Sequence, residues 1–304
     1  MEYVIGIDGG GTKTKLTICD ENRKILGTSV AGPSNILSSG YEVAKQSIMQ
    51  VMDMGVVRQG FSLVDCRALC IGVAGGARRS VQEDVASIIR GTGYTGKTVV
   101  THDAQTALMA GTDGAEGILM IAGTGSICYG INSSGKTCRV GGWGHLIDDE
   151  GSAYFISTHI LNTIMRAYDG RSGPTKLTRL VLDYMELGTV EEIIASIYKP
   201  MMSKHHIAEL SILIDEACEQ EDRAAFDIVE EASDALFKHV KVAVRELGFG
   251  GKEFNIVING SVIVSNKYIN EAFCTKVGEY YPNAKVKALD HDASYGAALI
   301  AMNC

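Results

Sequence analysis

The chain has 304 residues, of which 46% are hydrophobic and 21% are charged, a composition typical of a soluble globular protein with two domains. Its formal net charge of −8 and its lack of a Lys/Arg cluster argue against nucleic acid as a partner. No apolar stretch approaches the ~18 residues of a membrane span, and the N-terminus lacks a signal-peptide pattern, so we expect a cytoplasmic protein without a membrane partner. The eight cysteines lack zinc-like spacing, which predicts reduced, structural thiols.

Three short strands open the chain and predict an antiparallel meander. They cover residues 3–7, 14–19 and 25–30, and a polar turn joins the last two. Strand and helix alternate after the meander, which predicts parallel pairing for the later strands. We expect these later elements at 41–54 (helix), 67–74 (strand), 79–90 (helix) and 97–101 (strand).

The second half of the chain repeats the beginning of the first. Strands expected at 117–122, at 127–131 and up to Val140 again have a glycine turn between the first two, which suggests a duplicated fold. Residues 150–248 have the three- and four-residue apolar spacing of helices and predict a helical insertion. The closing elements are expected at 254–258 (strand), 267–280 (helix), 285–289 (strand) and from 292 (helix).

The segment Asp8-Gly9-Gly10-Gly11-Thr12-Lys13-Thr14 is the strongest local signal, because it lies between two strands and no helix follows it. Its glycines allow several backbone N–H groups to point at one phosphate. Thr12 and Thr14 add hydroxyls, Lys13 adds a positive charge, and Asp8 at the strand end can hold a hydrated Mg²⁺. The alternative is a glycine-rich hairpin with a surface lysine. A Walker loop is excluded, because its Gly-x-x-x-x-Gly-Lys-Ser/Thr pattern does not occur.

A second glycine turn, Gly123-Thr124-Gly125, follows the strand at 117–122. Alone it is a common hairpin sequence, but together with the first turn it indicates a second phosphate contact. The formal Gly-x-Gly-x-x-Gly at Gly91 to Gly96 follows a helix and precedes a strand, which is the reverse of the dinucleotide-binding context. We therefore interpret Gly91 to Gly96 as a connecting loop.

The most specific stretch is the fourteen-residue segment GGWGHLIDDEGSAY, from Gly141 to Tyr154. With it, the whole chain from residue 4 to about 300 resembles the superfamily of acetate kinases, sugar kinases, Hsp70 and actin. Within that superfamily it resembles the branch of N-acetylglucosamine kinases and BadF/BadG-type ATPases. The resemblance implies an ATP- and Mg²⁺-dependent sugar kinase that acts as a homodimer.

The resemblance also implies the fold. It predicts an α/β protein of two ribonuclease-H-like (actin-like ATPase) domains with a cleft between them. The N-terminal domain would comprise residues 1–104, with the C-terminal helix 292–304 packing back on it. The second domain would comprise 105–291 and carry the helical insertion at 150–248.

Site residues follow from the resemblance position by position. Asp103, at the end of the strand 97–101, would accept the proton of the attacking sugar hydroxyl, and Asp8 would hold Mg²⁺ through water. The residues implied for ATP and its phosphates are Gly10, Gly11, Thr12, Lys13, Gly123, Thr124, Gly125, Asn259, Gly260 and Ser261. Those implied for the sugar are Asn35, Gly142, Trp143, Gly144 and Asp149. Gly296-Ala297-Ala298 resembles the small-residue hinge helix of the superfamily.

Each of these roles has a structural alternative. Trp143 could pack in the core, Asp103 could be a helix N-cap, and His145 could make a structural hydrogen bond instead of a substrate contact. Asp148 stands where the amino-sugar kinases have glycine, and could either favour an amino group or face solvent. Asn259 stands where the family more often has glycine.

The function also has alternatives. The acceptor could be N-acetylglucosamine, glucosamine, N-acetylmuramic acid or another hexose, with the 6-hydroxyl implied by resemblance. A different class is the ATPase activator of acyl-CoA dehydratases or reductases, which typically holds an iron–sulfur cluster between subunits. Cys128 and Cys138 flank a hairpin and do not resemble such a site. A third reading is a nucleotide-dependent sugar sensor without kinase activity.

Overall fold

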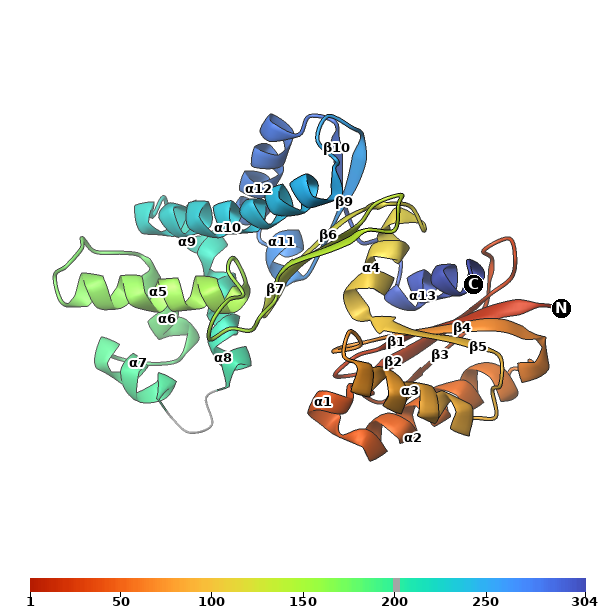
Figure 1. The fold of residues 1–304 in the computed structure, drawn as a ribbon. Coiled ribbons are helices and arrows are strands. Elements are labelled where there is room, and N and C mark those ends of the chain that lie inside the picture. The colour runs from red at the N-terminus through yellow and green to blue at the C-terminus, as the bar shows by residue number, and fades with distance from the viewer. Residues whose placement is uncertain (199–202) are drawn as a thin grey trace. The chain divides into compact units, whose positions relative to one another are not determined.

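The computed structural model describes residues 1–198 and 203–304, which form two compact α/β units (Figure 1). Unit 1 comprises Met1–Gly117 and Leu289–Cys304, and unit 2 comprises Ile118–Ala288. Each unit is built on one five-stranded sheet that mixes parallel and antiparallel pairs. The predicted α/β class is therefore confirmed.

The sheet of unit 1 has the strand order β3-β2-β1-β4-β5. β1 pairs antiparallel with β2 and parallel with β4, and β4 pairs parallel with β5. The predicted meander and the parallel strands after it are both confirmed, with bounds β1 Tyr3–Gly9, β2 Thr14–Cys19, β3 Ile25–Ala31, β4 Cys66–Val73 and β5 Lys97–His102.

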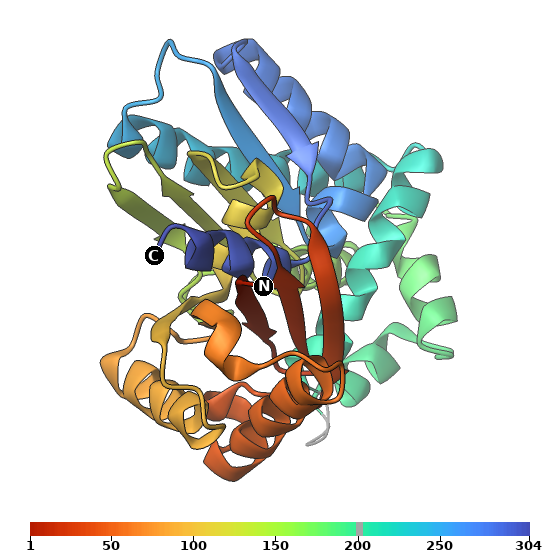
Figure 2. The ribbon, with the colours of Figure 1, turned by 90° about the vertical axis from the view of Figure 1, so that its right-hand side faces the viewer.

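Both faces of this sheet are covered, which explains why β1 reads as a continuous apolar run. Ile5 and Ile7 pack with α2 and α3 on one face, whereas Val4 packs with α13 on the other, as the alternation of side chains along a strand requires (Figure 2). The helices and irregular turns of unit 1 are α1 Ile36–Ser39, α2 Tyr41–Met52, a π-helix Asp53–Val57, a 3₁₀ turn Leu63–Asp65, α3 Arg79–Gly91, α4 Asp103–Thr112 and α13 Ala293–Met302.

Helix α13 approaches its neighbours closely because glycine stands at both contacts. A Cβ on Gly6 of β1 would lie 2.0 Å from the Ser294 carbonyl oxygen, and one on Gly296 would lie 1.9 Å from the Thr106 carbonyl oxygen in α4. No side chain fits at either position. The small-residue segment identified in the sequence thus packs α13 between β1 and α4.

Unit 2 has the strand order β10-β9-β6-β7-β8. Read in the opposite direction, β8-β7-β6-β9-β10, this order matches the β3-β2-β1-β4-β5 of unit 1 position by position. β7 pairs antiparallel with β8, and β9 pairs parallel with β10. The predicted duplication is confirmed at the level of topology, with bounds β6 Gly117–Ala122, β7 Ser126–Ile131, β8 Thr137–Gly141, β9 Phe254–Asn259 and β10 Ala284–Ala288.

The helical insertion lies between β8 and β9, as predicted. Its longest member, α10, is amphipathic and buries residues such as Ile228, Leu236 and Val240 in the core of unit 2. The helices of unit 2 are α5 Ala153–Tyr168, α6 Leu177–Tyr184, α7 Val190–Ile197, α8 Lys204–Glu209, a 3₁₀ turn Leu210–Ile212, α9 Leu213–Glu219, α10 Arg223–Leu247, α11 Ser261–Ser265 and α12 Lys267–Tyr280.

The division between the units differs from the expected boundary after residue 104. Helix α4 and the residues up to Gly117 belong with unit 1, because α4 packs on α13. The C-terminal helix also belongs with unit 1. Gly91 to Gly96 connects α3 to β5, in agreement with its interpretation as a loop.

Two negative observations concern the described residues. All eight cysteines are free thiols, and most of them are buried. No helix within 1–198 and 203–304 is long and apolar enough to cross a membrane.

Candidate active site

The first glycine turn joins β1 to β2 in unit 1. The Gly10 N–H donates to the Lys13 carbonyl at 3.0 Å, and the Gly10 carbonyl accepts from the N–H groups of Ser34 and Asn35 at 3.0 and 3.2 Å. Thr12 and Lys13, on the outer side of these hydrogen bonds, are exposed. The turn is therefore closed by backbone bonds on its inner side and open on its outer side.

Thr14 supports the turn from below and does not face a ligand. Its side chain is fully buried, and its hydroxyl donates to the Gly32 carbonyl and is also hydrogen-bonded to Ser34 Oγ, both at 2.7 Å. The suggestion that Thr14 adds a hydroxyl to a phosphate site is therefore wrong. Asn35 also has a local task, because its Oδ1 accepts from the Leu37 N–H and caps α1. The amide nitrogen of Asn35 is the part of this side chain that remains for a ligand.

Asp8 lies at the end of β1, opposite Lys15 of β2. Burial, together with the negative charges of Asp292 and Asp103, raises the pKa of Asp8 to about 6. Three carboxylates of unit 1 therefore lie close enough to influence one another, although they come from three separate elements. Such a concentration of carboxylate oxygen suits a divalent cation.

Sequence reasoning missed the network that anchors α13 beside Asp8. Lys15 Nζ donates to Asp292 Oδ2 at 3.0 Å, while Asp292 Oδ1 accepts from Ser294 and caps the helix. The Ser294 hydroxyl also bonds to Thr17 Oγ1 at 2.7 Å. Burial acts to raise the pKa of Asp292, but the hydrogen bonds from Lys15 and Ser294 outweigh it and hold that pKa below its usual range. The Asp-x-Ser pattern at the start of the last helix is typical of an N-cap and could have indicated the role of Asp292 from the sequence.

Asp103 is the first residue of α4, not its N-cap. His102 occupies the cap position, and its Nδ1 accepts from the Gln105 N–H at 3.2 Å. The Asp103 side chain is exposed, and among the described residues its Oδ1 accepts only from the neighbouring Ala104 N–H, at 2.9 Å. The N-cap alternative for Asp103 is therefore wrong, and most of its carboxylate remains open to a ligand.

The second glycine turn is packed against backbone in unit 2. Gly123 N–H donates to the Gly125 carbonyl at 2.9 Å, and the Gly123 carbonyl accepts from Ala153 N–H at 2.8 Å. Gly260, with φ of +99°, lies against this turn so closely that a Cβ there would be 2.4 Å from the Ala122 carbonyl oxygen. The two groups of residues in unit 2 that the resemblance implies for ATP, at 123–125 and 259–261, are thus neighbours. They include Ser261, which begins α11, and Asn259, whose Oδ1 accepts from Gly260 N–H at 2.9 Å.

Trp143 is on the surface and does not pack in the core, since 64% of it is exposed. The guanidinium of Arg139 stacks 4.2 Å from the centre of its ring and bonds to the carbonyls of Gly141 and Gly142. Asp148 Oδ2 accepts from the Trp143 N–H at 2.9 Å. Asp148 therefore braces the loop from within, which is a third role beside the two that the sequence suggested. Arg139 was not identified from the sequence.

Asp149 lies beside the second glycine turn. It is only 7% exposed, adopts φ of +61°, and its Oδ2 would be 2.7 Å from a Cβ on Gly125. No described residue donates a hydrogen bond to its carboxylate. His145 stacks edge-on against Tyr154 of α5 at 4.8 Å. The structure thus groups Asp149 with the predicted phosphate turn, while Gly144, with φ of +101°, forms the bend of the loop.

Within the described parts of the chain, no group of three or more His, Cys, Asp or Glu side chains could hold a metal ion. Cys128 of β7 and Cys138 of β8 lie on paired strands, and burial raises the pKa of both thiols. A bound cation would therefore rest on few direct protein ligands.

Comparison with known proteins identifies similar chains over the full length. The model of the BadF/BadG/BcrA/BcrD ATPase family matches residues 5–301. An N-acetylmuramic acid/N-acetylglucosamine kinase of Clostridium acetobutylicum is 38% identical over 99% of this chain and 98% of its own length. An N-acetyl-D-glucosamine kinase of Dictyostelium discoideum is 32% identical, again over 99% and 98% of the two chains.

Solved structures agree with the fold. The putative N-acetylglucosamine kinase of Chromobacterium violaceum superimposes with a TM-score of 0.73 at 20% identity, covering 99% of both chains. A ROK family glucokinase of Streptomyces griseus reaches a TM-score of 0.58 at 18% identity. These similarities support the expected actin-like sugar-kinase fold of two domains.

Proposed function

Since this chain belongs to the BadF/BadG/BcrA/BcrD ATPase family, we propose that it is an ATP-dependent kinase of an amino sugar. The observation that carries the proposal is the 38% identity over 99% of the chain to an N-acetylmuramic acid/N-acetylglucosamine kinase. We take N-acetylglucosamine or glucosamine as the first acceptors and the 6-hydroxyl as the position phosphorylated. N-acetylmuramic acid is the alternative acceptor, because it stands in the name of that relative.

Asp103 takes the role of general base in this proposal. Phosphoryl transfer has a loose transition state, so a base mainly needs to orient the attacking hydroxyl and accept its proton late. The exposed carboxylate of Asp103 at the start of α4 suits that task, since the helix N-terminus also fixes its position. Thr12 and Lys13 in unit 1, and Gly123, Thr124 and Gly125 in unit 2, are proposed to contact the phosphates.

Asp8 is the proposed ligand of Mg²⁺, through water molecules. Burial, followed by the negative charges of Asp292 and Asp103, raises its pKa to about 6, and a divalent cation nearby would favour the ionised carboxylate. Mg²⁺ keeps several waters and needs few carboxylates, which agrees with the ligand set described. When bound, Mg²⁺ neutralises charge on the phosphates of ATP.

The sugar is proposed to bind at the loop 142–149. The exposed indole of Trp143 offers an apolar face for a sugar ring. Arg139, which stacks on the indole, and Asp148, which accepts from the Trp143 N–H, hold this residue at the surface. Asp149 has a carboxylate with no donor from the described residues, so it can accept two sugar hydroxyls. Gly142, Gly144 and Asn35 complete the proposed set, and we infer a cytoplasmic homodimer from the resemblance alone.

The test is ATP turnover by the purified protein with and without Mg²⁺, against a panel of amino and neutral sugars. Mass spectrometry detects the sugar phosphate, and NMR assigns the phosphorylated hydroxyl. We expect one amino sugar to give product only with Mg²⁺. ATP hydrolysis that no sugar stimulates would contradict the proposal and favour the activator class, and an iron–sulfur absorption band would strengthen that result.

Asp103→Asn separates a kinase from a sugar sensor. The variant should lose at least about 100-fold in kcat, the lower range for a general base, while its ATP affinity stays within a few-fold. Asp84→Asn is the matched control, because Asp84 is an exposed carboxylate on α3 with the same change of charge. Wild-type-like activity in Asp103→Asn would remove Asp103 from the mechanism.

A further inference from the structure

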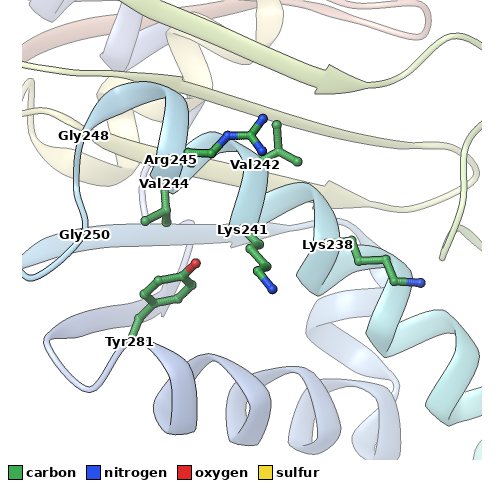
Figure 3. A pocket seen from close by; sticks show the side chains of 8 residues that line it. All are labelled: Lys238, Lys241, Val242, Val244, Arg245, Gly248, Gly250 and Tyr281. Carbon is green, nitrogen blue, oxygen red and sulfur yellow. The ribbon is translucent and has the colours of Figure 1, made fainter.

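Unit 2 contains an open pocket of about 590 Å³ that the proposed kinase reaction does not use. Helix α10 forms one wall with Lys238, Lys241 and Arg245, which recur at three- and four-residue spacing and so lie on one side of the helix. Tyr281, just before β10, forms the other wall. Figure 3 shows its hydroxyl directed toward α10, with Lys241 extending into the space between them. The remaining lining residues are Val242, Val244, Gly248 and Gly250.

The positive charge of this pocket is not balanced locally. The acid one turn before Lys238 is Asp234, which pairs with Lys276 of α12 at 2.8 Å. At the other end, Glu246 pairs with Arg245 at 3.1 Å and with Lys136 at 3.7 Å.

Lys238 and Lys241 therefore make no ion pair with any residue in 1–198 or 203–304, although the chain as a whole carries a net charge of −8. The Nζ of Lys241 lies 5.6 Å from the centre of the Tyr280 ring. Two unpaired ammonium groups in an acidic protein favour an anionic ligand.

The other groups of the pocket narrow the chemistry of that ligand. Burial raises the pKa of Tyr281, so its hydroxyl stays protonated and can donate a hydrogen bond. Val242 adds apolar surface that a bare inorganic ion would leave unused. The volume lies in the usual range for organic ligands, of about 300–1,000 Å³. Cations and a hydroxyl beside a small apolar wall suit a phosphate group carried on a compact organic body.

The pocket is separate from the site proposed for catalysis. Gly248 and Gly250 precede β9, and Tyr281 precedes the parallel strand β10, so the pocket lies at the amino ends of these strands. Asn259 and Gly260 lie at the opposite end of β9, about 20 Å away at roughly 3.3 Å per residue. We propose that this pocket is a second binding site of the protein, for a small organic phosphate.

The experiment is isothermal titration of three probes: glucose 6-phosphate, AMP and inorganic phosphate, with glucose as the neutral reference. The double variant Lys238→Gln/Lys241→Gln removes both unpaired charges. Lys24→Gln/Lys45→Gln is the matched control, because these two lysines of unit 1 are exposed and likewise form no ion pair within the described part of the chain. Tyr281→Phe removes only the hydroxyl.

We expect at least one phosphate ester to bind about 10-fold more weakly to the first double variant, with no change in the control. Tyr281→Phe should cause a smaller loss. The ester that binds more tightly, glucose 6-phosphate or AMP, identifies the organic group that the pocket accepts beside the phosphate. Stronger binding of inorganic phosphate than of either ester would contradict an organic ligand. Equal affinities in the wild type and the first double variant would overturn the proposal, as would equal losses in both double variants. Neither double variant changes a residue of the proposed catalytic site, so we expect ester binding there to be equal in both, and the outcome does not depend on kinase activity.

Discussion

The two glycine turns occupy equivalent places in two sheets of the same strand order, yet they are held in different ways. The first turn is braced by hydrogen bonds to the loop 32–35 and leaves Thr12 and Lys13 exposed. The second is held by close backbone packing against Gly260. The sheet topology that the two units share thus determines where each turn lies. The local contacts determine whether the glycines of a turn pack against the protein or remain accessible to a ligand.

The largest effect should come from Gly260→Ala, which tests the packed turn. Both the positive φ of +99° and a Cβ 2.4 Å from the Ala122 carbonyl oxygen oppose any side chain there. We expect a loss of about 3 kcal/mol or more in the free energy of unfolding, measured by urea denaturation. A loss below 1 kcal/mol would mean that the second turn is as tolerant as the first.

Asp8→Asn should change stability in the opposite direction. The pKa of Asp8 is raised from 3.8 to about 6, so its ionisation costs free energy that develops as the pH rises from about 4 to above 6. At pH 7.5 without divalent cations, the variant should be more stable than wild type by about 3 kcal/mol and should have a higher Tm. At pH 4 the difference should largely disappear.

Activity supplies the second readout for Asp8. The stabilised variant should lose Mg²⁺-dependent turnover, which is the usual compromise at a functional carboxylate. If the variant is less stable than wild type at pH 7.5, the Asp8 carboxylate stabilises the fold, which would contradict this prediction.

Thr14→Val tests the hydrogen-bonded brace of the first turn. The substitution leaves Ser34 Oγ and the Gly32 carbonyl without their buried hydrogen-bond partner, at a cost of about 1–2 kcal/mol. Thermal unfolding measures this cost. Thr17→Val, on the opposite face of β2 with a hydrogen bond to Ser294 of α13, is a control for the loss of a buried hydroxyl away from the turn. Only Thr14→Val should weaken ATP binding.

Gly11→Ala should have the smallest effect on stability, within about 0.5 kcal/mol. The nearest atom to a Cβ there is Ser38 Oγ at 3.9 Å, so the protein itself has room for the methyl group. If Gly11 approaches a phosphate, ATP affinity should still fall by at least about 10-fold. Unchanged affinity, measured by titration with ATP, would leave Gly11 as an ordinary hairpin residue.

Most of the fold was predictable because its strands are short apolar runs separated by turn residues. The positions of β1, β2, β4 and β6 follow directly from that pattern. The boundary between the units was not predictable, since it depends on α4 packing against α13, which lies almost 200 residues later in the chain. Periodicity describes one element at a time and carries no information on such a contact.

The candidate site shows the same limit. The glycine turns and Asp103 stand out because few residue types can perform their roles. The links between Lys15 and Asp292, and between Arg139 and Trp143, depend on ordinary charged residues that only the folded chain brings together. His102 as an N-cap was missed because a ring nitrogen is an uncommon acceptor at that position.

The place of α13 in the chain affects how this protein is made. The strands of unit 1 precede unit 2 in the chain, but its helix α13 leaves the ribosome only after the whole of unit 2. Until then, the face of the sheet that contains Val4, Ala68 and Cys70 lacks its cover. Unit 2 is continuous and can fold while synthesis proceeds, so the unit translated first is the one completed last.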